Sequence, residues 1–358
     1  MNRRITKCMI LIICGGLLVA RPFPARSDPL DPYIAAAKKE GSVRLGVTLR
    51  EEVHGVSAAD KYFDVFQKRY PFLKVSFKRI GGVRERERVI NEMAGGIHNY
   101  DVVPVSETMV PTIVGAKLPR VVDWVKLGAP QFLAHPENLG VSLRTPIFGI
   151  AYNRDLVPDE VARTFTWETC ADPKWKGKGA GHSRPRHLNV LYREIWGREK
   201  TLDYAKRWMA NRPAVEGSRS TLSSKVQAGA YHFLCGIPRT QIKDLQVYGD
   251  AKNLGIVFPE PVPVGTGDLI WVPEKAKHPN AGILFVVWSA TKEGQNLLDE
   301  VNFSGHPAVE GNEVHELLKG KQIAFFKWED SQYGDDDLAE ILTAMGMPVV
   351  RSKSKRKK

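Results

Sequence analysis

The chain has 358 residues, of which 43% are hydrophobic and 26% charged, a composition typical of a globular protein with room for two separate cores. The formal charge of +12 is concentrated at the ends: five basic residues lie in 1–27 and six in 351–358, which leaves +1 on the remainder. The net charge is therefore no indication of a nucleic-acid-binding surface, and we expect no nucleic-acid partner.

Residues 1–27 have the features of a secretory signal. Arg3, Arg4 and Lys7 precede an apolar run, and small residues precede a cleavage site after Ser27. The apolar run, residues 8–20, is shorter than the roughly 20 residues that span a bilayer. We predict a cleaved signal and an exported protein, with an uncleaved anchor as the alternative.

The basic tail and the cysteines depend on that export. The tail, residues 351–358, is predicted to be a disordered, solvated end, with contact to an anionic membrane surface as the alternative. Removal of the signal leaves two cysteines, Cys170 and Cys235. In an oxidising compartment they are a plausible disulfide, which would stabilise the fold by about 4 kcal/mol. Two separate buried thiols are the other interpretation.

The first part of the chain alternates between helices and strands. A helix at 33–40 precedes a strand at 43–47, and Phe63 and Phe66 lie on the apolar stripe of a second helix before a strand at 75–77. This order predicts a β-α-β unit, with Thr48 and Arg50 in the first loop after a strand.

Two further elements follow. The helix predicted at 82–94, with Val83 inward, alternates Arg and Glu, and this balanced charge favours a solvated face over a nucleic-acid contact. The strand at 100–105 is predicted to be buried and parallel. Its end delivers Ser106 and Glu107 to a loop, where open α/β sheets bind ligands.

The segment 149–179 predicts entry into a second lobe. An apolar strand at 149–153 is followed by two short helical segments and by a turn at 172–178 that carries Trp175. We interpret Trp175 and Trp288 as lobe-core residues.

The rest of the second lobe is predicted as loops, helices and strands. A glycine-rich loop at 180–186 precedes helices at 187–195, with Ile195 inward, and at 201–209. Thr221 is a candidate helix cap. Further strands are expected at 230–234, 254–258 and 269–273, and a helix at 281–288.

No catalytic motif is present, and we expect no enzyme activity and no cofactor. The sequence lacks a GxSxG elbow, an HExxH helix, a Walker loop and a CxxC pair. His182 and His187 are predicted to be surface histidines. The glycine-rich Gly265-Thr266-Gly267-Asp268 lies in the proline-rich linker at 259–267 and is interpreted as a hinge.

Five stretches resemble, in the same order, the periplasmic solute-binding proteins of ABC importers. They are residues 33–43, 100–103, 149–157, 166–179 with its DPKWKGK core, and 274–295. The nearest subgroup is associated with ferric iron and with thiamine-, polyamine- or phosphonate-type ligands. The resemblance implies a periplasmic monomer with a type II periplasmic-binding fold, in which two α/β lobes close on a ligand.

The implied organisation has five parts. We expect a signal peptide at 1–27, the first part of lobe 1 at 28–146, lobe 2 at 147–262, the second part of lobe 1 at 263–350 and a basic disordered tail at 351–358. The implied function is capture of a small solute for an inner-membrane ABC permease. An exported two-lobed enzyme on the same fold is the alternative.

The ligand is predicted to be an anion ahead of ferric iron. Ferric binders of this subgroup are expected to use adjacent tyrosines, but only Tyr231 stands at the corresponding motif, followed by His232. This is a poor set for Fe(III), which prefers oxygen ligands. The candidate ligand-binding residues in loops facing the expected cleft are Thr48, Arg50, Ser106, Glu107, His182, Ser183, Arg184, Ser218, Arg219 and Ser220. The resemblance to the ferric binders adds Tyr231. Hydroxyls and arginines suit an anionic or hydroxylated ligand.

Overall fold

The computed structural model describes residues 28–49 and 57–349. The predicted signal peptide, the basic tail and Arg50 lie outside these ranges. No helix in the described ranges has the length and apolar character needed to cross a bilayer.

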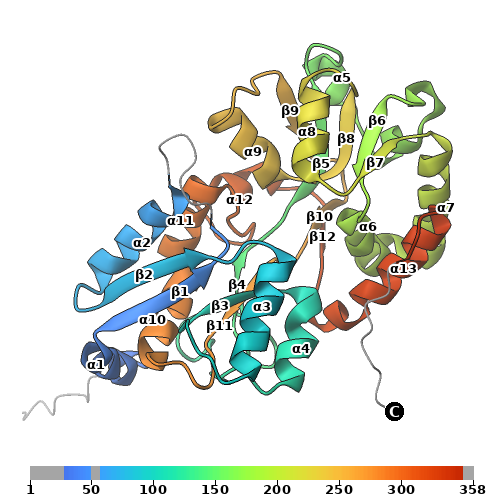
Figure 1. Ribbon diagram of the computed structural model, residues 1–358. Helices are drawn as coiled ribbons and strands as arrows, with labels where there is room; N and C mark the ends of the chain where they lie inside the picture. The colour runs from blue at the N-terminus through green and yellow to red at the C-terminus, as the bar shows by residue number, and fades with distance from the viewer. Residues whose placement is uncertain (1–27, 50–56, 350–358) are drawn as a thin grey trace, which may run out of the picture.

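The chain forms two α/β lobes, which lie at the lower left and the upper right of Figure 1. In the first lobe β1 and β2 pair in parallel, and β11 lies between β3 and β4 and is antiparallel to both. The strands of this lobe are β1 (Ser42–Val47), β2 (Lys74–Arg79), β3 (Val103–Ser106), β4 (Val141–Arg144) and β11 (Asp268–Trp271). Its helices are α1 (Asp31–Glu40), α2 (Ala58–Arg69), α3 (Val83–Ala94), α4 (Val110–Gly115), α10 (Pro279–Ala290) and α11 (Lys292–Asn302).

Helix α10 is the centre of the first core. Every residue from Ala281 to Ala290 is buried, so the helix is apolar on all sides. Trp288 packs there against Tyr62 and Phe66, with ring centroids 4.8 and 5.3 Å away. The prediction of Trp288 as a core residue is confirmed.

The second lobe is built on one five-stranded sheet in the order β7-β6-β8-β5-β9. All six residues of β5 are buried, as its apolar sequence predicts. The strands are β5 (Phe148–Asn153), β6 (Gly179–His182), β7 (Ala214–Glu216), β8 (Phe233–Pro238) and β9 (Leu254–Val257). The helices are α5 (Asp159–Ala162), α6 (Arg186–Leu191), α7 (Gly197–Ala210), α8 (Arg219–Gln227) and α9 (Arg239–Val247).

The predicted disulfide is present in the second lobe. Cys170, in a short 3-10 helix, is bonded to Cys235 of β8, with 6.4 Å between the two Cα atoms. Both residues lie in the core beside Phe233 and Trp167. The bond therefore ties the segment that precedes the Trp175 turn to the centre of the sheet.

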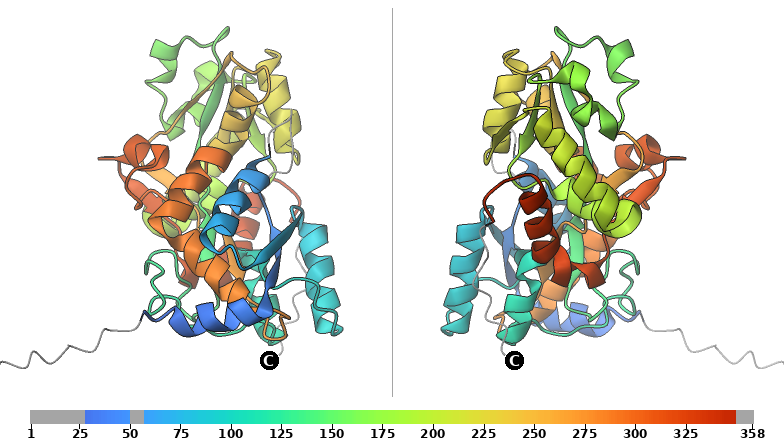
Figure 2. Two further views of the ribbon diagram at one scale, coloured as in Figure 1. Left: turned by 90° about the vertical axis from the view of Figure 1, so that its left-hand side faces the viewer. Right: turned by 90° about the vertical axis from the view of Figure 1, so that its right-hand side faces the viewer.

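Two strands connect the lobes. β10 and β12 pair in parallel, and Ile147 forms a bridge with Val264 of β10. The lobe boundaries stay predictions. The C-terminal segment, however, was expected in lobe 1, and its last helix, α13, packs against the second lobe. Leu338 and Ile341 of α13 pack in the second-lobe core, and Figure 2 shows α13 against α7. The connecting and C-terminal elements are β10 (Val262–Val264), α12 (Glu313–Leu318), β12 (Ile323–Phe325) and α13 (Gly334–Ala344).

Several local predictions were wrong. The strand expected at 100–105 begins at Val103 and pairs antiparallel, with only Val102 in a parallel bridge. The strand expected at 230–234 begins at Phe233 because Ala230 still donates a backbone hydrogen bond to Lys225 at the end of α8.

Four side chains also differ from their predicted positions. Val83 and Ile195 are exposed, and the helix that carries Ile195 changes to a π-helical turn at Tyr192–Trp196. His187 is buried beside Trp167 and is not on the surface. The cap of α8 is Ser218, whose hydroxyl accepts from the amide of Thr221.

Two buried histidines predict an acid-sensitive fold. His187 and His306 are 1% and 3% exposed, and burial lowers the pKa of each to about 3. Both stay neutral in the folded state at moderately acidic pH, whereas the unfolded chain protonates them below a pH of about 6.5. Since the unfolded state then binds more protons, the free energy of unfolding falls as pH drops from 6.5 toward 3.

We expect each of these histidines to lower the free energy of unfolding by about 2 kcal/mol at pH 5 relative to neutral pH. Denaturant unfolding at the two pH values measures the loss. In His187→Leu the loss of stability between neutral pH and pH 5 should be smaller than in the parent protein by about 2 kcal/mol, because leucine does not titrate. A variant whose stability falls as steeply as that of the parent would contradict this explanation.

Candidate functional site: an arginine-rich cavity between the lobes

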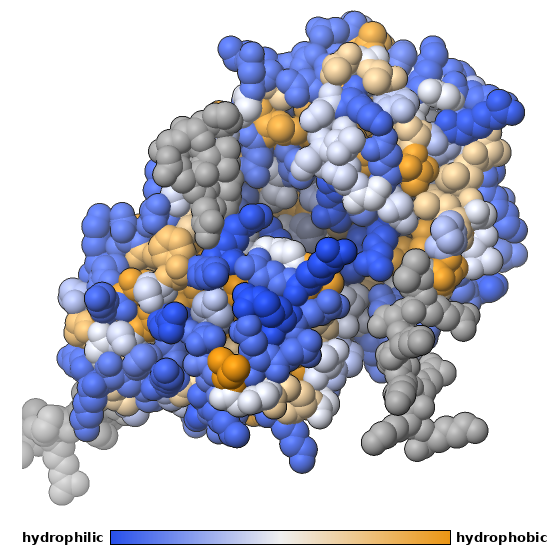
Figure 3. Space-filling view, in the orientation of Figure 1, coloured by the Kyte–Doolittle hydropathy of each residue, from blue (hydrophilic) through white to orange (hydrophobic). Residues whose placement is uncertain are grey.

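A cavity of about 800 Å³ lies where the two lobes face each other. Figure 3 shows the surface hollowed in this region, with hydrophilic residues around it. Its volume is within the usual range for small-molecule sites. The wall is formed by strand ends and helix starts from both lobes, so the fold brings together loops that are far apart in sequence.

The structure brings six of the predicted site residues into this wall. They are Ser106, Glu107, His182, Arg184, Arg219 and Ser220. Thr48 lies behind the wall, where its hydroxyl donates to Asp268 at 3.0 Å. Ser183 and Ser218 belong to the same loops but do not line the cavity.

Tyr231 is not brought to the cavity. It precedes β8, whose opposite end, Pro238, reaches the cavity wall. The rise of a strand places Tyr231 about 20 Å from that end. It packs instead beside Leu222 and Val226 in the core of the second lobe.

Asp268 organises the first-lobe wall. Its carboxylate accepts from Arg86 Nη1 at 2.8 Å and from Arg144 Nε at 2.5 Å, and the side chains of Asp268 and Arg86 are only 8% and 7% exposed. Burial alone would raise the pKa of this carboxyl, but the two guanidinium groups outweigh burial and hold the pKa well below its ordinary value. Asp268 is therefore ionised and fixes the orientation of both arginines.

One ion pair crosses the cavity. Glu107, which follows β3 of the first lobe, accepts a hydrogen bond from Arg186, the first residue of α6 in the second lobe. Both side chains are largely buried, with 18% and 24% of their surface exposed. The lobes thus already touch at this point, and the charge of Arg186 is neutralised within the protein.

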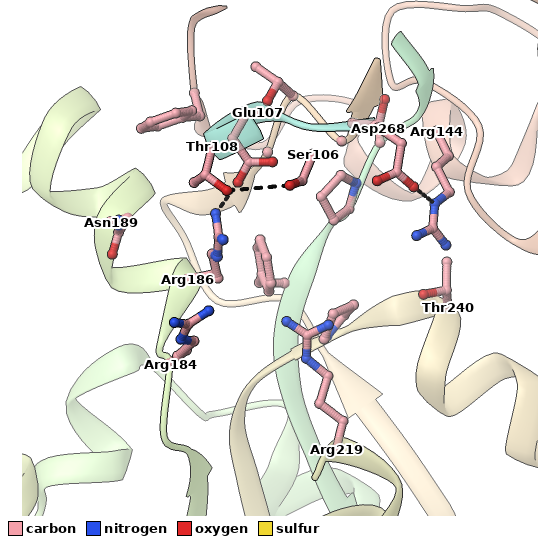
Figure 4. Close-up of a pocket in the computed structure, with 18 of the residues that line it drawn as sticks. Ser106, Glu107, Thr108, Arg144, Arg184, Arg186, Asn189, Arg219, Thr240 and Asp268 are labelled. Carbon is pink, nitrogen blue, oxygen red and sulfur yellow. Dashed lines mark hydrogen bonds and ion pairs between the residues drawn. The ribbon is translucent and has the colours of Figure 1, made fainter. Parts of the chain in front are cut away.

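Two other arginines have no such partner. In the part of the chain that the structure describes, the guanidinium groups of Arg184 and Arg219 form no hydrogen bond or ion pair. Burial, and then the charges of Arg186 and Arg144, lower the pKa of Arg219. Figure 4 shows Arg184 and Arg219 pointing into the cavity. An anion there would relieve this repulsion.

His182 holds the two loops that carry these arginines. Its Nδ1 accepts from the amide of Arg184 at 3.0 Å, and its Nε2 donates to the carbonyl of Gly217 at 2.9 Å. Burial, together with the charge of Arg219, lowers the pKa of His182 and favours the neutral ring, and the carbonyl of Gly217 requires the proton on Nε2. Because both ring nitrogens are engaged by backbone, the imidazole acts as a brace between the loops.

Helix N-termini add further positive potential. Gly82, Ser218 and Pro238 are the N-caps of α3, α8 and α9, and residues of all three starts line the cavity. The first-turn amides of a helix stabilise anions. In contrast, no group of three or more His, Cys, Asp or Glu side chains within the described ranges is arranged to hold a metal ion.

Sequence reasoning missed the residues that dominate the wall. Arg86 was assigned to a solvated helix face, yet it is 6% exposed and paired with Asp268. Asp268 itself was assigned to a hinge. The further missed lining residues are Arg144, Arg186, Asn189 and Thr240. A usable signal was the helical phase of Arg86, which precedes Val89, Ile90 and Met93 by three, four and seven residues and therefore lies on the same face of α3.

No protein-family model and no curated protein sequence matches the chain. Its structure matches solved binding proteins. FutA (IdiA) of Trichodesmium, in complex with iron and citrate ligands, has a TM-score of 0.67 at 21% identity, over 86% of this chain and 100% of that one. Apo ferric ion-binding protein A of Pasteurella haemolytica gives 0.68 at 17% identity, over 87% and 100%.

A third match is the substrate-binding protein of an ABC transporter from Agrobacterium tumefaciens, with a TM-score of 0.66 at 16% identity over 85% of this chain and 94% of that one. These matches show that the chain has the type II periplasmic-binding fold. They agree with the family resemblance found in the sequence. At these identities the shared property is the fold, and the ligand must be argued from this chain's own residues.

Proposed function

We propose that the protein is the periplasmic solute receptor of an ABC importer, which captures a small anion between its lobes and delivers it to an inner-membrane permease. One observation supports the choice of an anion as ligand: Arg184 and Arg219 point into the interlobe cavity, and in the described residues their guanidinium groups form no hydrogen bond or ion pair. The receptor function itself is supported by the fold and by the position of the cavity at the interlobe cleft.

A ferric ion is a poorer fit to the same cavity. The carboxylates on its wall, Asp268 and Glu107, are both paired with arginines. Tyr231, the residue expected from ferric binders, lies elsewhere in the second lobe. Hard Fe(III) needs several oxygen ligands, whereas guanidinium groups repel a cation.

A thermal-shift screen of the purified protein tests the proposal. Carboxylates and phosphonates should raise the melting temperature, whereas the cations thiamine and spermidine should not, because the cavity carries an excess of positive charge. Iron(III) that produced a tyrosinate absorption band lost in Tyr231→Phe would instead support a ferric receptor. Chemical conversion of a bound anion would support the enzyme alternative.

Arg219→Ala should separate binding from folding. We expect it to weaken binding of a carboxylate or phosphonate identified in the screen by about 10- to 100-fold, the usual range for a charge-assisted hydrogen bond. The unfolding temperature without ligand should stay the same or rise, because the variant removes a repelled cation that has no ion pair. Lys206→Ala on α7 removes an equal but exposed charge and is the control. Equal binding by both variants would contradict the proposal.

A further inference from the structure

The cavity wall carries more positive than negative charge. Five arginines line the cavity, namely Arg86, Arg144, Arg184, Arg186 and Arg219, whereas the described lining residues include two carboxylates, Glu107 and Asp268. Arg219 is repelled by its neighbours Arg186 and Arg144, and Glu107 only partly offsets that repulsion. A single negative charge from a ligand would leave this wall with uncompensated cations in a partly desolvated space.

The excess is divided between the two lobes. In the first lobe Asp268 is shared by Arg86 and Arg144, so one positive charge remains over. Asp268 contacts Nε of Arg144, and the side chain of Arg144 is 33% exposed, so its terminal nitrogens remain for a ligand. Figure 4 shows Arg144 near Thr240, on the opposite side of the cavity from Arg184.

In the second lobe the excess is carried by Arg184 and Arg219. The pair between Glu107 and Arg186 is balanced and contributes nothing to it. The loops that present Arg184 and Arg219 are braced together by the ring of His182. The brace fixes the spacing of the two loops, and both side chains point into the same cavity, so they can bind two oxygens of a single acid group or two neighbouring acid groups.

We infer that the natural ligand carries at least two separate acid groups, one bound by Arg144 on the first lobe and one by Arg184 and Arg219 on the second, so that the ligand itself joins the lobes. This inference rests on the proposed function and specifies its ligand class: dicarboxylates, tricarboxylates or phosphonocarboxylates. A ligand that contacts both lobes favours closure, since it binds the closed arrangement better than the open one.

Isothermal titration with a matched series of acids tests this inference. The series comprises butyrate, succinate, glutarate, adipate, tricarballylate and 3-phosphonopropionate. At least one diacid or triacid should bind 100-fold or more tightly than butyrate, with an optimum chain length and with a steeper decrease in affinity as salt is added. Equal affinities for butyrate and every polyacid would overturn the two-group inference and leave the anion receptor intact. Binding of no anion at all would overturn the proposed function itself.

Variants locate the two groups. Arg219→Ala and Arg144→Gln should each reduce the affinity for the best polyacid by 10- to 100-fold and bring it toward the affinity for butyrate. Arg219→Lys keeps the charge but loses the planar fork, so it should recover part of the loss. Arg144→Lys preserves a cation beside Asp268 and tests the first-lobe group if Arg144→Gln does not fold. A polyacid that depends on Arg219 but binds equally well to both Arg144 variants would overturn the assignment of the first-lobe group.

Discussion

Asp268→Asn should lower the free energy of unfolding by about 3–5 kcal/mol, although the two side chains have nearly the same shape. The carboxylate accepts from Arg86, from Arg144 and from the hydroxyl of Thr48. An amide cannot neutralise either guanidinium, and Arg86 is 6% exposed and cannot turn toward water. Denaturant unfolding measures the loss, which corresponds to a decrease in melting temperature on the order of 10 °C.

Asp203→Asn is the matched control, because Asp203 also pairs with an arginine. Its partner is Arg207 one helical turn away, and the two side chains are 65% and 44% exposed. Exposed pairs contribute about 0–1 kcal/mol. If the two variants were destabilised equally, the buried network would not have the role assigned to it.

Anions should raise the melting temperature of Asp268→Asn more than that of the parent protein. Loss of the Asp268 charge adds one to the positive excess of the cavity wall, so a bound polyacid has more charge to neutralise. We therefore expect succinate or tricarballylate to raise the melting temperature of Asp268→Asn by more than that of the parent protein. A smaller rise would show that orientation of Arg86 and Arg144 matters more for binding than the net charge.

The sequence located those parts of the cavity that follow from local strand, loop and helix patterns. Ser106 and Glu107 were found because they follow a predicted strand, and Arg184 and Arg219 because each lies in a polar loop before a predicted helix. The structure adds a short strand before each of these two loops, β6 and β7. The ends of strands that share a sheet lie at common edges, so their loops converge without any knowledge of the pairing. This reasoning needs only the order of elements.

The sequence could not locate the residues that depend on strand register. Asp268 begins β11, where it lies opposite Arg144 of β4 and Ser106 of β3. The two partners of that ion pair are 124 positions apart. The predicted strand started one residue later, at Leu269, and its neighbours could not be derived from its own sequence, so nothing in the local pattern placed Asp268 beside an arginine.

The alternation of Arg and Glu in α3 concealed a different kind of residue. Most of these side chains are solvated, as the balanced charges indicate, but Arg86 faces inward with Val89 and Ile90. Residues 84–88 of α3 are all charged, so the helical period of 3.6 residues places one of them on the buried face. The ion pair with Asp268 of β11 compensates the charge of that arginine in its buried position.

Gly267→Ala should be the most disruptive single-methyl change at this site. Gly267 has a φ of +78°, a conformation that costs other residues about 1–2 kcal/mol. An added Cβ would also lie 1.5 Å from the carbonyl oxygen of Arg144, which is backbone and cannot rotate away. The backbone of β4 or β11 must therefore shift, and with it the pair between Arg144 and Asp268.

Gly320→Ala separates the two causes, because Gly320 has nearly the same φ, +76°, but no atom within 4 Å of an added Cβ. We expect Gly320→Ala to lower the free energy of unfolding by about 1–2 kcal/mol, from conformation alone. Gly267→Ala should lower it by several kcal/mol more. Where the protein still folds, the variant should reduce polyacid affinity at least 10-fold, since the backbone that carries Arg144 must move. Comparable stability of the two variants, with unchanged binding by Gly267→Ala, would mean that the β4–β11 contact does not set the geometry of the anion site.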